Sequence, residues 1–388
     1  MINGTGDGMS DETAAAGIPA GATDSDRVKQ YHRISRFLSV AGYIVDFVLL
    51  LILLFAGWSV ALRTVAFHYS PRPSLALLIY LVLFGAITQV AGLPFSFLEG
   101  FWLEHRHGLS NLTLAGWVKD QLKGLAVGGT LGLLAAEFLY AAIRHWPEHW
   151  WLVCAVTFLG FFVLMANLAP VLIFPIFFKF KPLENPSLTE RLLELTRRAH
   201  TEVKGVFEWK LSEKSNKANA ALMGLGNTRR IILSDTLLAK FQDEEVEAVL
   251  AHELGHHVHR HIFQMIAIQG AATLAGFYLI HRTLDWLTPH FGFHGAADFA
   301  NLPLLALVTT VLSLLLLPAV NSYSRAMERQ ADTYALRAIP SRQDFITSME
   351  KLAELNLAER QPHPWIEFIF HSHPSIQKRI DFAQRFIA

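Results

Sequence analysis

The chain has 388 residues, of which 52% are hydrophobic and only 17% are Asp, Glu, Lys or Arg, whereas an ordinary soluble protein carries about 25% charged residues. Its 33 basic and 33 acidic residues give a formal net charge of zero, which argues against a nucleic-acid-binding protein because such binding depends on neutralising phosphates. A single cysteine, Cys154, excludes a disulfide framework within the chain. These figures leave a membrane protein or an unusually apolar globular protein.

The N-terminal segment, residues 1–36, begins with a stretch rich in Gly, Ala, Ser, Thr and Asp. This composition predicts a flexible tail. No short apolar region with a small-residue cleavage site precedes the first long apolar run, so we expect no cleaved signal peptide.

Long apolar runs decide in favour of a membrane protein. A helix needs about 20 apolar residues to cross about 30 Å of hydrocarbon. Four of the runs contain no charged residue, and two contain one each, Asp46 and Glu137. The sequence favours neither of two roles for these carboxylates, lining a chamber among the helices or a purely structural role. We predict six transmembrane helices, at residues 37–62, 73–98, 124–143, 149–178, 261–281 and 299–324.

One polar segment, residues 179–260, lies between the fourth and fifth spans, and a second, residues 325–388, follows the sixth. The spans therefore form a four-span region, 37–178, and a two-span region, 261–324. Periodicity and turn residues predict a small α+β domain in the polar segments, with helices at 188–199 and 243–261 and strands at 205–211, 218–225 and 229–233. The expected fold is mainly α, a polytopic membrane helix bundle carrying this domain.

Basic residues at the ends of the spans predict the orientation. The short loops on one side contain only four of them, Arg63, Arg72, Arg144 and Arg282. Cytoplasmic flanks carry an excess of Lys and Arg, so we expect both termini and the polar domain to be cytoplasmic. The flanking residues on that side are Arg33, Arg36, Lys123, Lys179, Lys181 and Arg260.

A metal-binding motif lies in the predicted helix 243–261. His256 follows His252 by four positions, which places both imidazoles on one face of a helix, and Glu253 lies beside them. The neighbouring His257, His259 and His261 also allow a simpler interpretation, a histidine-rich surface helix near a bilayer. A metzincin is excluded, because that motif requires Gly at 259 and His at 262, where this chain has His and Ile.

A catalytic zinc uses three protein ligands, so a third one is needed. Glu328 and Asp332 are again four residues apart, at the end of the last predicted span. Glu328 can therefore complete the metal site, with Asp332 accepting a hydrogen bond from a ligand imidazole. The alternative is an amphipathic helix with solvated acidic residues.

Seven sequence blocks follow one another along the chain: Leu93–Phe97 with Glu104, His107-Gly108 and Lys119-Asp120; Ala169-Pro170 with Pro175–Pro182; Ser215–Gly224; Arg230–Leu237; His252–His256; Ser324–Asp332; and His371–Pro374 with Arg379. In this order they resemble the type I CAAX prenyl proteases, which are integral-membrane zinc metallopeptidases. Eukaryotic members have an additional N-terminal span, whereas we expect six spans here. They also have a charged insertion before the position of Asp243, which this sequence lacks, and an aromatic residue where this chain has Ala221.

The resemblance implies one zinc ion, bound by His252, His256 and Glu328, with Glu253 as general base. It also implies that Asn219 and Ala220, on an expected edge strand, bind substrate and that His373 and Arg379 hold substrate or stabilise the oxyanion. A chamber among the spans is a further implication.

The resulting hypothesis is a zinc endopeptidase in a lipid bilayer that cleaves peptides or proteins, with prenylated C-terminal peptides as expected substrates. A membrane quality-control metalloprotease is the alternative enzyme, and a metal transporter is the alternative from another class. A transporter would have several metal ligands within the bilayer, whereas these ligands lie at span ends. No nucleic-acid partner is expected.

Overall fold

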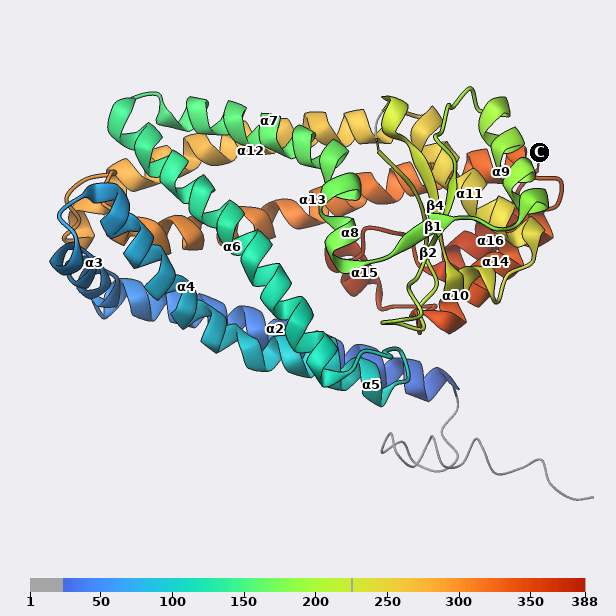
Figure 1. The fold of residues 1–388 in the computed structure, drawn as a ribbon, viewed down its shortest axis with the longest axis horizontal. Helices are drawn as coiled ribbons and strands as arrows, with labels where there is room; N and C mark the ends of the chain where they lie inside the picture. Colours follow the sequence, from blue (N-terminus) through green and yellow to red (C-terminus); the bar gives the residue numbers. More distant parts are fainter. Residues whose placement is uncertain (1–23, 225, 388) are drawn as a thin grey trace, which may run out of the picture.

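The computed structural model describes residues 24–224 and 226–387. Figure 1 shows an elongated molecule with long helices at one end and, at the other, a small sheet surrounded by helices. The start of α2 and the C-terminal end both lie toward the sheet. Most of the predicted tail, residues 1–23, lies outside the described residues.

The prediction of six membrane helices is confirmed within the described part of the chain. Each of the six helices that are long and apolar enough to cross a membrane overlaps one predicted span: Ser25–Phe55, Pro73–Arg106, Leu114–His145, Trp150–Phe177, His261–Phe291 and Phe299–Ala338. Their elements are α2 (Asp24–Phe55), α4 (Pro73–Phe97) with η1 (Leu98–Leu103) and α5 (Glu104–Arg106), α6 (Leu114–His145), α7 (Trp150–Leu172) with α8 (Phe174–Phe177), α12 (His261–Leu287) with η3 (Thr288–Phe291), and η4 (Phe299–Asn301) with α13 (Leu302–Ala338).

The first span differs from the prediction of 37–62 at both ends. The helix α2 ends at Phe55, and Gly57 has a left-handed backbone (φ 73°) that turns the chain into a separate short helix, α3 (Trp58–Tyr69). Helix α2 also begins at Asp24, so residues 24–36 are not part of a flexible tail. These residues are held by partners far away in the sequence, since Tyr31 donates to Glu104 (2.6 Å) and Arg36 pairs with Glu359 (2.6 Å).

The two carboxylates within the predicted spans do not share one environment. Asp46 is exposed on α2 and Glu137 is half-buried on α6. Cys154 on α7 is fully buried among apolar side chains, as expected for a small apolar residue.

A four-stranded sheet, with strand order β1-β2-β4-β3, forms the scaffold of the polar domain. Strands β2 and β4 are parallel, and β1 and β3 add antiparallel to β2 and β4. All three predicted strands are present: β2 and β3 are shorter than predicted, and β4 is shifted by one residue. Strand β1 was missed because it has only three residues and ends in proline. The strands are β1 (Phe180–Pro182), β2 (Val206–Trp209), β3 (Ala220–Met223) and β4 (Arg230–Ser234).

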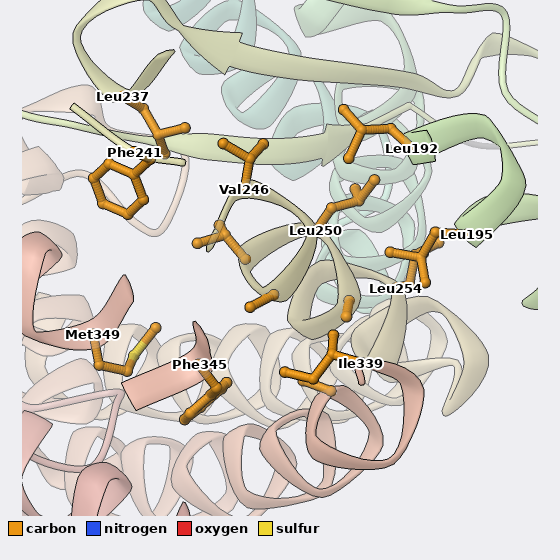
Figure 2. Packing of buried hydrophobic residues seen from close by; sticks show 14 of the residues in the cluster. Leu192, Leu195, Leu237, Phe241, Val246, Leu250, Leu254, Ile339, Phe345 and Met349 are labelled. Carbon is orange, nitrogen blue, oxygen red and sulfur yellow. The ribbon is translucent and has the colours of Figure 1, made fainter. Parts of the chain in front are cut away.

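Helix α11 (Asp243–Val258) lies at the centre of the domain core. Leu250 and Leu254 point from it toward Leu192 and Leu195 of α9 (Pro186–Arg198), as Figure 2 shows, and all four belong to one cluster of buried apolar side chains. The surrounding elements are α9 (Pro186–Arg198), η2 (Gly226–Thr228), α10 (Asp235–Leu238), α14 (Arg342–Leu355), α15 (Pro364–Phe370) and α16 (Ile376–Arg385).

Two helix boundaries place the metal-binding segments. The predicted helix 243–261 is interrupted, because Arg260 adopts a left-handed backbone (φ 55°) that ends α11 and starts α12 at His261. By contrast, α13 is continuous for 37 residues, or about 55 Å at 1.5 Å per residue. A length of about 30 Å crosses a bilayer, so the remainder of α13 extends into the polar domain.

Candidate metal centre

Helix α11 begins with a capping box that fixes its first turn. The Gln242 side chain accepts from the backbone of Glu245, and the Glu245 carboxylate accepts from the Gln242 N–H (2.7 Å). Three acidic residues in this turn favour the positive end of the helix dipole. The helix then carries His252 and His256 on one face, one turn apart.

Gly255 allows α11 to lie very close to α13. A Cβ atom at this position would lie 2.8 Å from the Ala331 Cα and 3.0 Å from its carbonyl oxygen, which is closer than real Cβ contacts. The close approach brings Glu328, one turn before Ala331 on α13, to the two histidines. The glycine of the motif is therefore a packing requirement.

His252, His256 and Glu328 form a cluster whose geometry fits a tetrahedral metal ion. The His252 Nε2 lies 3.2 Å from Glu328 Oε2, the His256 Nε2 lies 3.2 Å from Glu328 Oε1, and the two Nε2 atoms are 3.2 Å apart. Zinc with ligand bonds of about 2.1 Å separates its ligand atoms by about 3.4 Å. Among the described residues none donates a hydrogen bond to the buried Glu328 Oε2, as expected for an oxygen directed at a cation.

A buried carboxylate and a guanidinium hold His252 in position. The His252 Nδ1–H donates to Asp332 Oδ1 (2.9 Å), which leaves Nε2 free to bind a metal. Arg379 donates from Nε and Nη2 to the two Asp332 oxygens (3.0 and 2.6 Å). Burial and Arg379 lower the pKa of His252, but the neighbouring carboxylates of Asp332 and Glu328 outweigh them and raise the pKa to about 9. The metal-free cluster thus holds a proton that a bound cation displaces.

His256 has its own supporting pair, which the sequence did not single out. Its Nδ1 lies 2.9 Å from the Nδ1 of His261, and the His261 Nε2 lies 2.9 Å from Gln330 Oε1. If His256 binds metal through Nε2, its Nδ1–H donates to His261, and the His261 Nε2–H then donates to Gln330. His261 is 3% exposed; in the sequence it was one member of a histidine-rich run.

A cavity of about 520 Å³ opens beside the metal cluster. His373 lies between cavity and cluster, with its Nε2 3.2 Å from Glu328 Oε1 and its Nδ1 2.9 Å from Ser372 Oγ. The structure therefore brings together all nine residues expected at the site. Six of them line the cavity, namely Asn219, Ala220, His252, Glu253, His373 and Arg379, and the other three, His256, Glu328 and Asp332, complete the cluster behind it.

Strand β3 forms one side of the cavity and lies at an edge of the sheet. It pairs with β4 on one side, from Ala220 with Leu233 to Met223 with Arg230. An edge strand offers unpaired backbone groups to an extended peptide. The His252–His256–Glu328 cluster, the Glu253 carboxylate and an open sheet edge thus meet at one cavity, an arrangement suited to peptide hydrolysis.

Comparisons with known proteins agree with this assignment. The family description "Peptidase family M48" matches residues 182–387, and "CAAX prenyl protease N-terminal, five membrane helices" matches residues 21–179. Within residues 24–179, the described part of the latter range, the structure has four helices long enough to cross a membrane, together with the shorter α3.

Individual relatives cover most of the chain. An uncharacterized metalloprotease, YhfN, from Bacillus subtilis is 31% identical over 92% of this chain and 84% of its own length. A CAAX prenyl protease 1 homolog from Arabidopsis thaliana is 32% identical over 76% of this chain and 70% of its own. The crystal structure of S. mikatae Ste24p superposes with a TM-score of 0.84 at 25% identity, covering 94% of this chain and 89% of that one. The chain therefore belongs to peptidase family M48 and is a multi-pass membrane metalloprotease similar to the CAAX prenyl proteases.

Proposed function

We propose that the protein is a zinc endopeptidase whose ion is bound by His252, His256 and Glu328. The observation that carries the proposal is the shared cavity, in which the metal cluster, Glu253 and the free edge of β3 meet. Two imidazoles and one carboxylate are a ligand set of catalytic zinc sites, which leave a fourth position open. When bound there, zinc supplies a Lewis acid for the scissile carbonyl.

The side chains of the cavity have separate tasks in this proposal. Glu253 takes a proton from the attacking water and returns it to the leaving amine. His373 and Arg379 stabilise the negative charge that develops on the carbonyl oxygen, and the Arg379 contacts with Asp332 also hold His252 in place. Asn219 and Ala220 bind the substrate backbone.

The expected substrate is the C-terminal region of a prenylated protein, and the support for it is the similarity to CAAX prenyl protease 1 homologues. A quality-control protease acting on unmodified membrane proteins remains the alternative. We further propose that the termini and the peptidase segments, 179–260 and 325–388, are cytoplasmic. The membrane region 37–178 precedes the first peptidase segment, and the membrane region 261–324 lies between the two.

The test of the mechanism is a Glu253→Gln variant of the full-length protein in detergent or lipid. Loss of the base should lower peptide cleavage roughly 100- to 10,000-fold, while metal content stays unchanged because Glu253 is not a ligand. Glu244→Gln is the matched control, since Glu244 lies on the same helix and its carboxylate is exposed. Undiminished cleavage by metal-loaded Glu253→Gln would refute the mechanism.

The substrate class needs a second experiment. A farnesylated CAAX peptide, its unprenylated counterpart and an unmodified membrane protein are compared as substrates, each with and without a chelator. The proposal expects cleavage of the farnesylated peptide to be fastest and to disappear with the chelator. Preferential degradation of the unmodified protein would favour the quality-control alternative.

A further inference from the structure

Asn356 closes one end of the free edge of β3. The orientation of the strand follows from Asn219, whose carbonyl accepts from Ser234 N–H (2.9 Å) and whose N–H donates to Ser234 Oγ (2.9 Å). Its backbone groups therefore face β4. Backbone groups of successive residues in a strand alternate in direction, so those of Ala218 and Ala220 face the open edge.

The open edge is already occupied at Ala218. The Ala218 N–H donates to Asn356 Oδ1 (2.9 Å), and the Asn356 Nδ2–H donates to the Ala218 carbonyl (3.1 Å). A side-chain amide thus makes the two hydrogen bonds that one residue of a neighbouring strand would make. The first position at which a bound peptide can pair is consequently Ala220.

The blocked position belongs to the peptide site itself. Asn356 and Ala218 line the same cavity as Glu253 and His373. The preceding residue, Lys217, pairs with Glu104 (2.8 Å), so the chain on the N-terminal side of Ala218 is also engaged. An extended peptide in this cavity meets Asn356 at one end.

Asn356 is held from the membrane region as well as from its own helix. It caps the C-terminus of α14, and the following Leu357 has a left-handed backbone (φ 47°). The Leu357 carbonyl lies 2.7 Å from His32 Nε2 of α2, and Arg36 of α2 pairs with Glu359 (2.6 Å). These contacts fix the turn that directs the Asn356 side-chain amide toward Ala218.

We propose that Asn356 is a specificity-determining residue that limits how many peptide residues can pair with β3 on one side of the scissile bond. The inference rests on the proposed peptidase function. Peptides that end at the blocked position fit the site, whereas longer ones must displace the amide or leave the strand. The enzyme thereby acts at a fixed distance from one end of its substrate.

The test uses the full-length metal-loaded protein and nested series of one cleavable peptide, extended residue by residue at either end. For the wild type, extension beyond a set length at one end should lower kcat/KM roughly tenfold, the change expected from losing one or two backbone hydrogen bonds. In Asn356→Ala this penalty should fall below about threefold, with new cleavage positions visible by mass spectrometry.

Controls separate this inference from folding and from the peptidase function. Asn356→Asp keeps the size of the side chain and the acceptor for the Ala218 N–H but loses the donor to the Ala218 carbonyl, so its length penalty should lie between those of the wild type and Asn356→Ala. Asn216→Ala is the matched control, because Asn216 bonds to the backbone at Gly108 (2.8 Å) and lies outside the cavity lining. Metal content and thermal unfolding report on the fold. If cleavage depends on Glu253 but both Asn356 variants keep the wild-type length limit, the inference is wrong and the peptidase function stands.

Discussion

Each histidine of the metal cluster depends on a partner that holds its second nitrogen. For His252 this partner is Asp332, which Arg379 holds in turn. For His256 it is His261, in contact with Gln330. The spacing of Glu328 and Asp332 was enough to predict the first partner. The second could not be predicted, because the turn at Arg260 brings the His261 ring back to His256, and nothing in the local pattern distinguishes it from His257 and His259.

The role of His261 can be tested through metal affinity. In His261→Ala the His256 Nδ1 loses its acceptor, so the ring is no longer fixed with Nε2 toward the cluster. Loss of such a partner weakens metal binding about 10- to 100-fold. Competition of purified protein with a zinc-binding indicator measures this change. His257→Ala, on the helix α11 that carries His252 and His256, is the matched control. Equal zinc affinity of the two variants would contradict the prediction.

At the level of elements, the sequence specifies most of the fold. Long apolar runs located all six membrane helices, and periodicity with turn residues located three of the four strands. The features that were missed depend on contacts between residues far apart in the sequence. The polar segment 24–36 is helical and is held by contacts with Glu104 and Glu359. Asn356 bonds to Ala218, which lies 138 residues away in the sequence. Local patterns carry no information about such pairings.

The crossing of α11 and α13 is the contact on which the metal site depends, and Gly255 makes it possible. In Gly255→Ala the new methyl group overlaps the Ala331 backbone, which cannot move aside as a flexible side chain would. We expect a loss of about 1 to 3 kcal/mol in stability and weaker metal retention, because Glu328 moves away from the histidines. Thermal unfolding and metal content after dialysis measure both effects.

Gly276→Ala, in α12, is the control for that variant. No heavy atom outside the helix's own backbone and its immediate neighbours lies within 4 Å of a Cβ at this position, and Ala is favoured over Gly in a helix by about 0.5 to 1 kcal/mol. This variant should be as stable as the wild type or slightly more so. If Gly255→Ala behaves in the same way, the close helix crossing is not required.

On the scale of the whole molecule, two helices connect the membrane region to the catalytic cavity. Helix α13 continues from the last span to Glu328 and Asp332, and the first turns of α2 hold the segment that follows Asn356. The metal cluster therefore lies at the ends of the spans, outside their apolar centres. Figure 1 shows the sheet and the loop between α6 and α7 at opposite ends of the molecule, so chemical labelling can distinguish the two sides.

The orientation can be tested with engineered cysteines, because the single native one, Cys154, is buried. Ser187 on α9 is exposed on the catalytic side, and Glu148, between α6 and α7, is exposed at the opposite end. The basic flanks predict that the catalytic side is cytoplasmic. A membrane-impermeant maleimide added to intact cells that carry the protein in their plasma membrane should therefore label Glu148→Cys, whereas Ser187→Cys should react only after permeabilisation. The wild type controls for reaction at Cys154, and the reverse pattern would place the peptidase domain outside the cytoplasm.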